Sequence, residues 1–79
     1  MVEAETRLSD LQALERRVRT KARDLGATSV ILLVANTRHN RAVLDAYPEF
    51  RMMYPVSARE CLRAIAEGRL PEGDALVLL

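Results

Sequence analysis

The chain has 79 residues, of which 49% are hydrophobic, which is enough for one small folded domain and argues against a disordered segment. Twelve basic residues nearly balance eleven acidic ones, so the net charge of +1 excludes a wholesale electrostatic nucleic-acid binder and leaves only local patches. The single Cys61 excludes an internal disulfide, and the acidic start MVEAETR is unlike a secretory signal. No apolar run approaches the ~20 residues of a membrane span, so we expect a cytoplasmic protein without a membrane partner.

Period-two alternation of apolar and polar residues predicts a half-buried strand from Val2 to Leu8. Ser9 and Gln12 then have the spacing of a capping box, which marks a helix start. Apolar residues recur at helical spacing as far as Leu25, and the following glycine predicts the helix end. The first strand therefore leads directly into a helix of about four turns.

The run from Val30 to Ala35 is apolar on both faces and predicts a strand buried on both sides. Together with the preceding strand and helix it forms a parallel βαβ unit with a right-handed crossover. Asn36 or Thr37 can cap a second helix over residues 38–47, which Pro48 is expected to end. The inward face of that helix is expected to carry Val43, Ala46 and Tyr47.

Three further elements complete the predicted fold. Residues 51–56 read as a strand, which Pro55 restricts to an edge position because proline cannot donate to a ladder. Ser57 and Glu60 form a second capping box, and the helix after it is expected to bury Ala58, Cys61, Leu62 and Ile65 before Gly68 and Pro71 end it. Residues 75–79 are apolar on both faces and predict a second central strand.

These elements define an α/β fold with a small, mostly parallel sheet of about four strands and three helices, in the order β-α-β-α-β-α-β. Because the second and fourth strands are expected to be buried on both faces, the predicted order of strands across the sheet is 1-2-4-3. Right-handed crossovers then put the first two helices on one face and the third on the other. The apolar side of the first strand is expected to face the first helix, so that Glu3, Glu5 and Arg7 lie on the thinly covered face.

Glu3 and Glu5 stand two positions apart on the predicted first strand, so their side chains leave the same face with Cα atoms about 6–7 Å apart. Two such carboxylates could hold one hard cation, and Mg²⁺ commonly uses one or two carboxylates plus waters. A solvated strand face, with Arg7 offsetting the charge of Glu5, is the alternative. No cofactor is expected, and Mg²⁺ at Glu3 and Glu5 is kept as an option.

A polar cluster follows the second predicted strand, at the carboxyl end where open α/β sheets place their ligands. Free N–H groups at a helix start plus arginine side chains could hold a phosphate or carboxylate, and the candidate residues are Asn36, Thr37, Arg38 and Arg41. The field of a helix end contributes only ~0.3–1 kcal/mol, so the arginines would have to supply most of the binding. His39 has no partner carboxylate nearby in sequence, and a helix cap with an exposed histidine is the alternative.

The predicted first helix is basic on its outer side, and a phosphate-contacting surface for nucleic acid is one interpretation, with Arg16, Arg17, Lys21 and Arg23 as candidate residues. These side chains spread around more than half of the helix, which favours a solvated face. Cys61 lies on the apolar side of the third predicted helix and is expected to be a packing residue. Without a Gly-rich phosphate loop, zinc-ligand spacing or nucleophile elbow, no catalytic residue is assigned.

Four stretches together resemble the C-terminal part of actinobacterial helix-turn-helix regulators of the Xre type: VEAETRL, LQALERRVRTKARDLG, SVILLVANTRHNR and GRLPEGDALVLL. The order of strand, basic helix and buried strand is also similar to the second half of the PD-(D/E)XK nuclease core. That resemblance implies that Glu3 matches the metal-binding carboxylate, Glu5 stands in place of the usual lysine, and Gln12 is the polar residue of the following helix. The strand with the family's first metal-binding aspartate and the helix-turn-helix have no counterpart in this sequence, so the implied metal site is incomplete.

We therefore expect one α/β domain over residues 1–79 that belongs to a larger fold and does not catalyse a reaction alone. Its expected function is that of an interaction or dimerisation module, as in the C-terminal domain of a DNA-binding transcriptional regulator. An unpaired outer edge of the first strand would join two copies in a homodimer, and nucleic acid would be contacted through a separate domain. Two alternatives stay open: a Mg²⁺-dependent nuclease-like remnant that uses Glu3 and Glu5, and a small-anion-binding module at residues 36–41.

Overall fold

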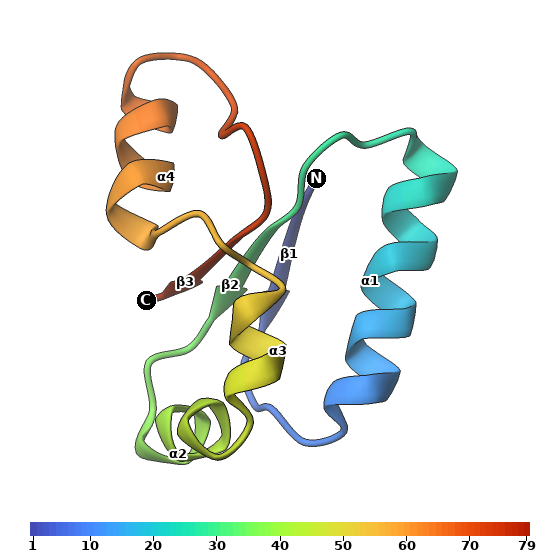
Figure 1. Ribbon diagram of the computed structural model, residues 1–79, viewed down its shortest axis with the longest axis vertical. Helices are drawn as coiled ribbons and strands as arrows, with labels where there is room; N and C mark the ends of the chain where they lie inside the picture. Colours follow the sequence, from blue (N-terminus) through green and yellow to red (C-terminus); the bar gives the residue numbers. More distant parts are fainter.

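The computed structural model describes all 79 residues and has three parallel strands in the order β1-β2-β3 together with four helices. The elements are β1 (Val2–Glu5), α1 (Leu11–Leu25), β2 (Ile31–Val34), α2 (Arg38–Ala46), α3 (Pro48–Met52), α4 (Ala58–Ala66) and β3 (Ala75–Leu78). Figure 1 shows the sheet between α1 on one side and α4 on the other, with α2 and α3 together at one end. The predicted α/β class with a small parallel sheet is confirmed.

Strand β2 is the centre of the sheet, as its apolar sequence predicts. Its first residue, Ile31, pairs with Val2 of β1 on one side and with Ala75 of β3 on the other. The side chains of Leu32 and Val34 are fully buried. A strand that is covered on both faces tolerates no polar side chain without a partner, which explains the continuous apolar run.

The core is divided by the sheet into two parts. On one face, α1, α2 and α3 cover the larger cluster, which includes Val18, Leu32, Leu44 and Phe50. On the opposite face, Cys61 of α4 packs with Ile31, Ala75 and Val77. The predicted placement of the first two helices on one face and of the helix after residue 57 on the other is therefore confirmed.

The helix ends follow local hydrogen-bonding chemistry. The N-cap of α1 is Asp10, whose side chain accepts from the backbone N–H of Ala13, so the predicted capping box from Ser9 to Gln12 is wrong by one residue. An aspartate carboxylate caps a helix at least as well as serine, and it adds a favourable charge at the helix start. Gly26 ends α1 in the left-handed region with φ of 65°, as predicted.

The predicted caps of the other two long helices are confirmed. Thr37 accepts from the N–H of Asn40 at the start of α2, and Ser57 accepts from the N–H of Glu60 at the start of α4. Each of these side chains satisfies a backbone donor that the first helical turn leaves without an intrahelical partner.

The predicted strand over residues 51–56 is not formed. Pro48 does follow the end of α2, but it occupies the first turn of another helix, α3, where the fixed φ of proline is favourable. Of the predicted strand only Val56 pairs, through one parallel bridge to Ala75 on the outer side of β3. The fourth strand is thus reduced to a single bridge at the edge where it was expected.

Two predicted inward faces also need correction. Helix α2 buries Asn40 and Leu44, whereas Tyr47 lies beyond its end and is 51% exposed. Helix α4 buries Cys61 and Ala64, whereas Leu62 and Ile65 on its flank are about half exposed. The apolar stripe of α4 is wider than the strip of sheet beneath it, so only its centre is covered, and the flank stays in solvent.

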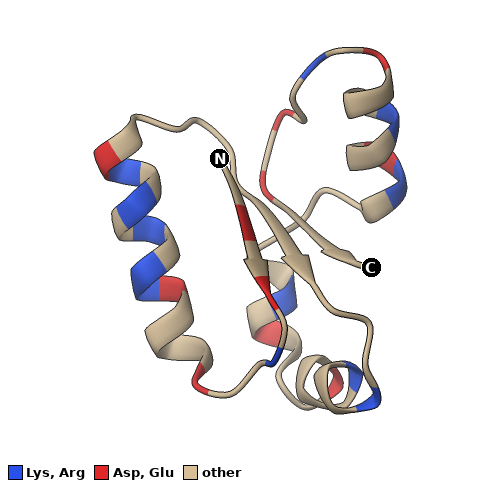
Figure 2. Ribbon diagram, turned by 180° about the vertical axis from the view of Figure 1, so that it is seen from behind, with Lys and Arg blue, Asp and Glu red and all other residues tan.

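The orientation of β1 is the reverse of the prediction. Glu3 and Glu5 pair in register with Leu32 and Val34, and paired residues of parallel strands point to the same face, which here is the face of α1. The acidic positions of β1 and the basic positions of α1 lie opposite one another in Figure 2. The alternate residues, Val2 among them, consequently face the α4 side, where Val2 is 57% exposed.

Candidate functional site

The buried side chain of Asn40 joins the two segments that leave the carboxyl ends of β1 and β2. Its Oδ1 accepts from the N–H of Leu8 at 2.8 Å, and its Nδ2 donates to the carbonyls of Thr6 at 3.0 Å and Ala35 at 2.9 Å. His39 adds a hydrogen bond from Nε2 to the Leu8 carbonyl at 2.7 Å, and because a carbonyl only accepts, Nε2 carries the proton. This polar cluster therefore holds the backbone together at the end of the sheet.

The four candidate anion-binding residues lie next to one another at this end of the sheet, but two of them are engaged in contacts within the chain. Arg41 donates from Nη1 to the side-chain oxygen of Asn36 at 2.7 Å, and Thr37 caps α2. Arg38 is exposed, and its side chain forms no hydrogen bond or ion pair. One free guanidinium at a helix start is a weaker arrangement than the converging pair of arginines that the sequence suggested.

The candidate metal residues Glu3 and Glu5 share one face of β1, as expected, but each is neutralised by a cation from α1. Lys21 donates from Nζ to Glu3 at 2.7 Å, and Arg17 donates to Glu5. No group of three or more His, Cys, Asp or Glu side chains gathers in a way that could hold a metal ion. The two carboxylates thus serve to attach the edge strand to α1.

The four candidate nucleic-acid residues are dispersed around α1 and do not line one surface. Arg17 and Lys21, four positions apart, reach across to β1, and Arg23 lies 3.7 Å from Asp24. Arg16 is directed to another side of the helix, where it contributes to a groove against α3. Two of the four charges are therefore compensated by carboxylates of the sheet.

A second polar cluster, which the sequence did not reveal, connects α1 with the segments on either side of α4. Glu15 accepts from the hydroxyl of Tyr54 at 2.7 Å and from Nε of Arg19 at 2.6 Å. Arg19 also donates to Asp74 at 2.6 Å, and Asp74 in turn accepts from the N–H of Val30 at 2.8 Å. Only the Glu15 and Arg19 pair, at helical spacing i and i+4, could have been found from the sequence.

The electrostatics of this cluster follow from its geometry. Burial raises the pKa of Tyr54, and the hydrogen bond to the Glu15 carboxylate raises it further. Partial burial by itself would lower the pKa of Arg19. The hydrogen bonds to Glu15 and Asp74 have the larger combined effect, so the pKa of Arg19 is raised. The guanidinium also lies 5.5 Å from the centre of the Tyr54 ring, a cation–π distance. Arg19 and Tyr54 therefore both keep their protons at neutral pH.

Cys61 is fully buried in the α4 side of the core, as the sequence predicts for a packing residue. Burial raises the pKa of its thiol, which leaves the thiolate fraction low. A buried, protonated thiol is a poor nucleophile, which fits a packing role for Cys61.

The outer edge of β1 pairs with no other strand, whereas the outer edge of β3 carries one bridge, from Val56 to Ala75. The carbonyls of Met1 and Glu5 accept from Ile31 and Ala35, so odd-numbered residues of β1 bond to β2. Because bonding direction alternates along a strand, the N–H and C=O groups of Val2 and Ala4 point away from the sheet.

Next to this edge lies a partly exposed apolar surface on the α4 side of the sheet. We call it the open face, and it consists of Val2, Ala4 and Leu33 from the strands and Leu62 and Ile65 from α4. Helix α4 packs over β3, and its other flank, with Glu60 and Ala64, borders the segment at residues 69–72. The flank with Leu62 and Ile65 is therefore directed toward β2 and β1.

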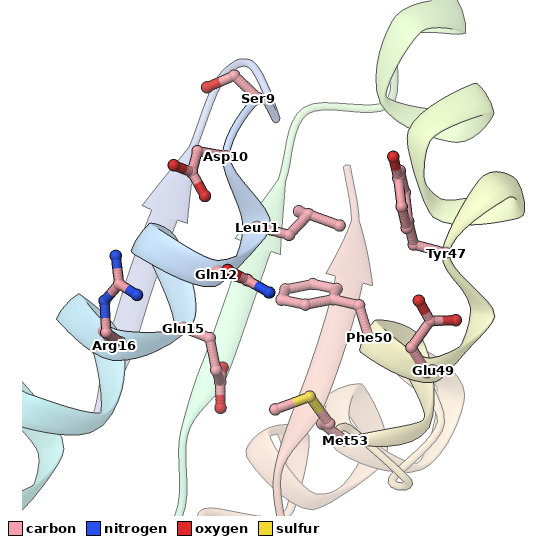
Figure 3. A pocket seen from close by; sticks show the side chains of 10 residues that line it. All are labelled: Ser9, Asp10, Leu11, Gln12, Glu15, Arg16, Tyr47, Glu49, Phe50 and Met53. Atoms are coloured by element: carbon pink, nitrogen blue, oxygen red, sulfur yellow. The ribbon is translucent and has the colours of Figure 1, made fainter.

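A groove of about 640 Å³ lies between the start of α1 and helix α3. Figure 3 shows side chains of both helices directed toward one another across it, among them Leu11 and Glu15 from α1 and Phe50 and Met53 from the α3 segment. A second hollow, lined by residues between Val56 and Glu72, is smaller at about 340 Å³. The polar groups that line the groove are carboxylates, an amide, hydroxyls and one guanidinium. No nucleophile contacts a base among them, as nucleophilic catalysis would require.

Comparisons with protein-family models, curated proteins and solved structures found no match to this chain. None of its helices has the length and apolar composition that would let it cross a membrane.

Proposed function

We propose that this chain is a non-catalytic α/β interaction module that forms a homodimer through the outer edge of β1 and the adjoining open face. The observation that carries the proposal is the coincidence of unpaired backbone groups and exposed apolar side chains on one strand. Natural proteins usually cover or charge such an edge, because it is a template for pairing with another strand.

The edge is complementary to itself, which favours a second copy as the partner. Val2 and Ala4 together present two donors and two acceptors. An antiparallel β1 from a second copy, related by a two-fold axis, offers the same groups in return. The result would be a continuous six-stranded sheet built from two three-stranded sheets.

Side-chain chemistry on the two faces supports the same arrangement. Residues opposite one another in an antiparallel pair share a face, so Val2 and Ala4 of both copies would gather on the open-face side. Glu3 and Glu5 would gather on the other side, where Lys21 and Arg17 already neutralise them. The pairing therefore adds apolar contacts without bringing unpaired carboxylates together.

In a longer protein such a module would suit the dimerisation part of a DNA-binding transcriptional regulator, in keeping with the resemblance to Xre-type regulators. This role is an analogy at the level of fold and sequence pattern. The nuclease alternative is not favoured, since Glu3 and Glu5 are held in ion pairs with α1. The anion-binding alternative is not favoured either, since Thr37 and Arg41 are committed to contacts within the chain.

Light scattering coupled to size exclusion at micromolar concentration tests the proposal with two variants. In Ala4→Pro the lost N–H is one that points outward, so the ladder to β2 is kept while the intermolecular ladder is blocked. In Val2→Lys a charge enters the open face at an exposed position that tolerates it in the monomer. The control is Met52→Lys, which changes a 78% exposed apolar residue of α3 on another surface.

We expect the wild type and Met52→Lys to be dimers, and both β1 variants to be monomers with unchanged circular dichroism. If Ala4→Pro does not fold, Val2→Lys decides the question, because that side chain is largely in solvent. A wild type that stays monomeric, or β1 variants that dimerise as well as the wild type, would show the proposal to be wrong.

A further inference from the structure

The groove between α1 and α3 combines an apolar floor with an acidic rim. Figure 3 shows its lining, which comes from residues 9–16 at the start of α1 and residues 47–53 around α3. The hollow between the two helices is open to solvent. A hollow of about 640 Å³ is within the roughly 300–1,000 Å³ range of small-molecule sites.

The apolar part of the groove is formed mainly by the α3 segment. Phe50 is buried and provides the floor, while Tyr47 and Met53 stand beside it with about half of their surfaces exposed. Leu11 closes the groove from the side of α1, opposite the Phe50 ring (Figure 3). Aromatic rings and a thioether together favour a flat or elongated apolar group, and the ring faces also attract cations.

The charges of the lining are unequal, with three carboxylates against one guanidinium. Glu49 forms no hydrogen bond or ion pair, and Asp10 uses one oxygen as the cap of α1. Glu15 is partly neutralised by Arg19 from outside the groove. Arg16 lies on the far side of the lining from Glu49 and Tyr47 (Figure 3), so the end of the groove near α3 keeps its negative charge.

We propose that this groove binds a small organic cation with an apolar or aromatic body. The body would rest on Phe50 and Met53, and the cationic group would lie at the rim near Glu49. The inference does not depend on self-association, because the groove lies on α1 and α3, away from β1.

Titration of the ¹⁵N-labelled protein, followed by amide chemical shifts, tests the site with three probes of nearly one shape. They are phenethylamine, which is cationic, 2-phenylethanol, which is neutral, and 3-phenylpropionate, which is anionic. We expect phenethylamine to shift the amide signals of Leu11, Gln12 and Met53 at millimolar concentration. The neutral probe should bind more weakly, and the anion should not bind.

Two variants then separate charge recognition from a non-specific apolar contact. Glu49→Gln should lower the affinity for phenethylamine about two- to fivefold, as expected for the loss of one exposed charge pair. Glu72→Gln, an exposed carboxylate of the segment before β3, should leave the affinity unchanged. Absence of binding, shifts located elsewhere, equal binding of the three probes, or no effect of Glu49→Gln would each overturn the proposal.

Discussion

Replacement of Asn40 by alanine is predicted to be among the most damaging single changes outside the apolar core. The variant removes one acceptor and two donors from a fully buried position and leaves the N–H of Leu8 without a partner. An orphaned buried group costs about 1–3 kcal/mol, and loss of the side-chain volume adds to it. We expect a total of about 2–4 kcal/mol, against a stability of roughly 4–12 kcal/mol for a domain of this length.

Urea unfolding followed by circular dichroism measures this cost. Asn36→Ala is the matched control, since its side-chain oxygen accepts only an exposed hydrogen bond from Arg41, and it should cost less than about 0.5 kcal/mol. A cost below about 1 kcal/mol for Asn40→Ala would refute the conclusion that this amide holds the two segments together.

The variant Asn40→Asp adds a test by pH. One oxygen of the aspartate can still accept from Leu8, but the other would face the carbonyls of Thr6 and Ala35. Burial against two acceptors should raise the carboxyl pKa in the folded state above its unfolded value. The folded state then binds more protons than the unfolded chain, so the stability of this variant should increase as the pH falls. A stability that does not depend on pH in this direction would contradict the geometry.

Three further predictions concern the second polar cluster and the end of α1. Tyr54→Phe should lower the free energy of unfolding by about 1 kcal/mol at neutral pH. Because folding raises the pKa of Tyr54, the stabilisation by its hydroxyl is full below pH ~10 and is lost as the pH rises above it. In urea unfolding, the variant should therefore lose less stability at alkaline pH than the wild type. Asp74→Ala should destabilise more than Asp74→Asn, since the amide keeps an acceptor for the N–H of Val30, and equal midpoints would contradict this. Gly26→Ala should lower stability by about 1 kcal/mol in thermal unfolding through backbone strain alone, because no atom lies within 4 Å of the added Cβ.

Most of the fold could be predicted because its determinants are local. The apolar run at β2, the helical spacing of α1 and the cap residues Thr37 and Ser57 act within a few residues of where they stand. Residues 51–56 show the limit, since their alternating pattern is compatible with a strand, but the helix that starts at Pro48 takes the first two of these residues. Which of the two forms depends on packing of Phe50 into the core, and that contact is not local.

The candidate sites were harder to predict for the same reason. Glu3 and Glu5 were correctly placed on one face of a strand, but the face itself depends on Lys21 and Arg17, which pair with them across the α1–β1 layer. Strand β1 has valine and alanine on one face and two glutamates on the other, and this pattern does not indicate which face a helix will cover. The side that is charged here is the covered one, which leaves the apolar positions of β1 at the surface.

Amide hydrogen exchange of β1 as a function of protein concentration tests the central proposal most directly. In the monomer the N–H of Ala4 points outward and should exchange rapidly, whereas the N–H of Glu3 is bonded to β2 and should be protected. If two copies pair through this edge, protection of Ala4 should increase with concentration in parallel with dimer formation measured by sedimentation, while Glu3 stays protected throughout. Rapid exchange of Ala4 at every concentration, whether or not the protein associates, would contradict dimerisation through β1.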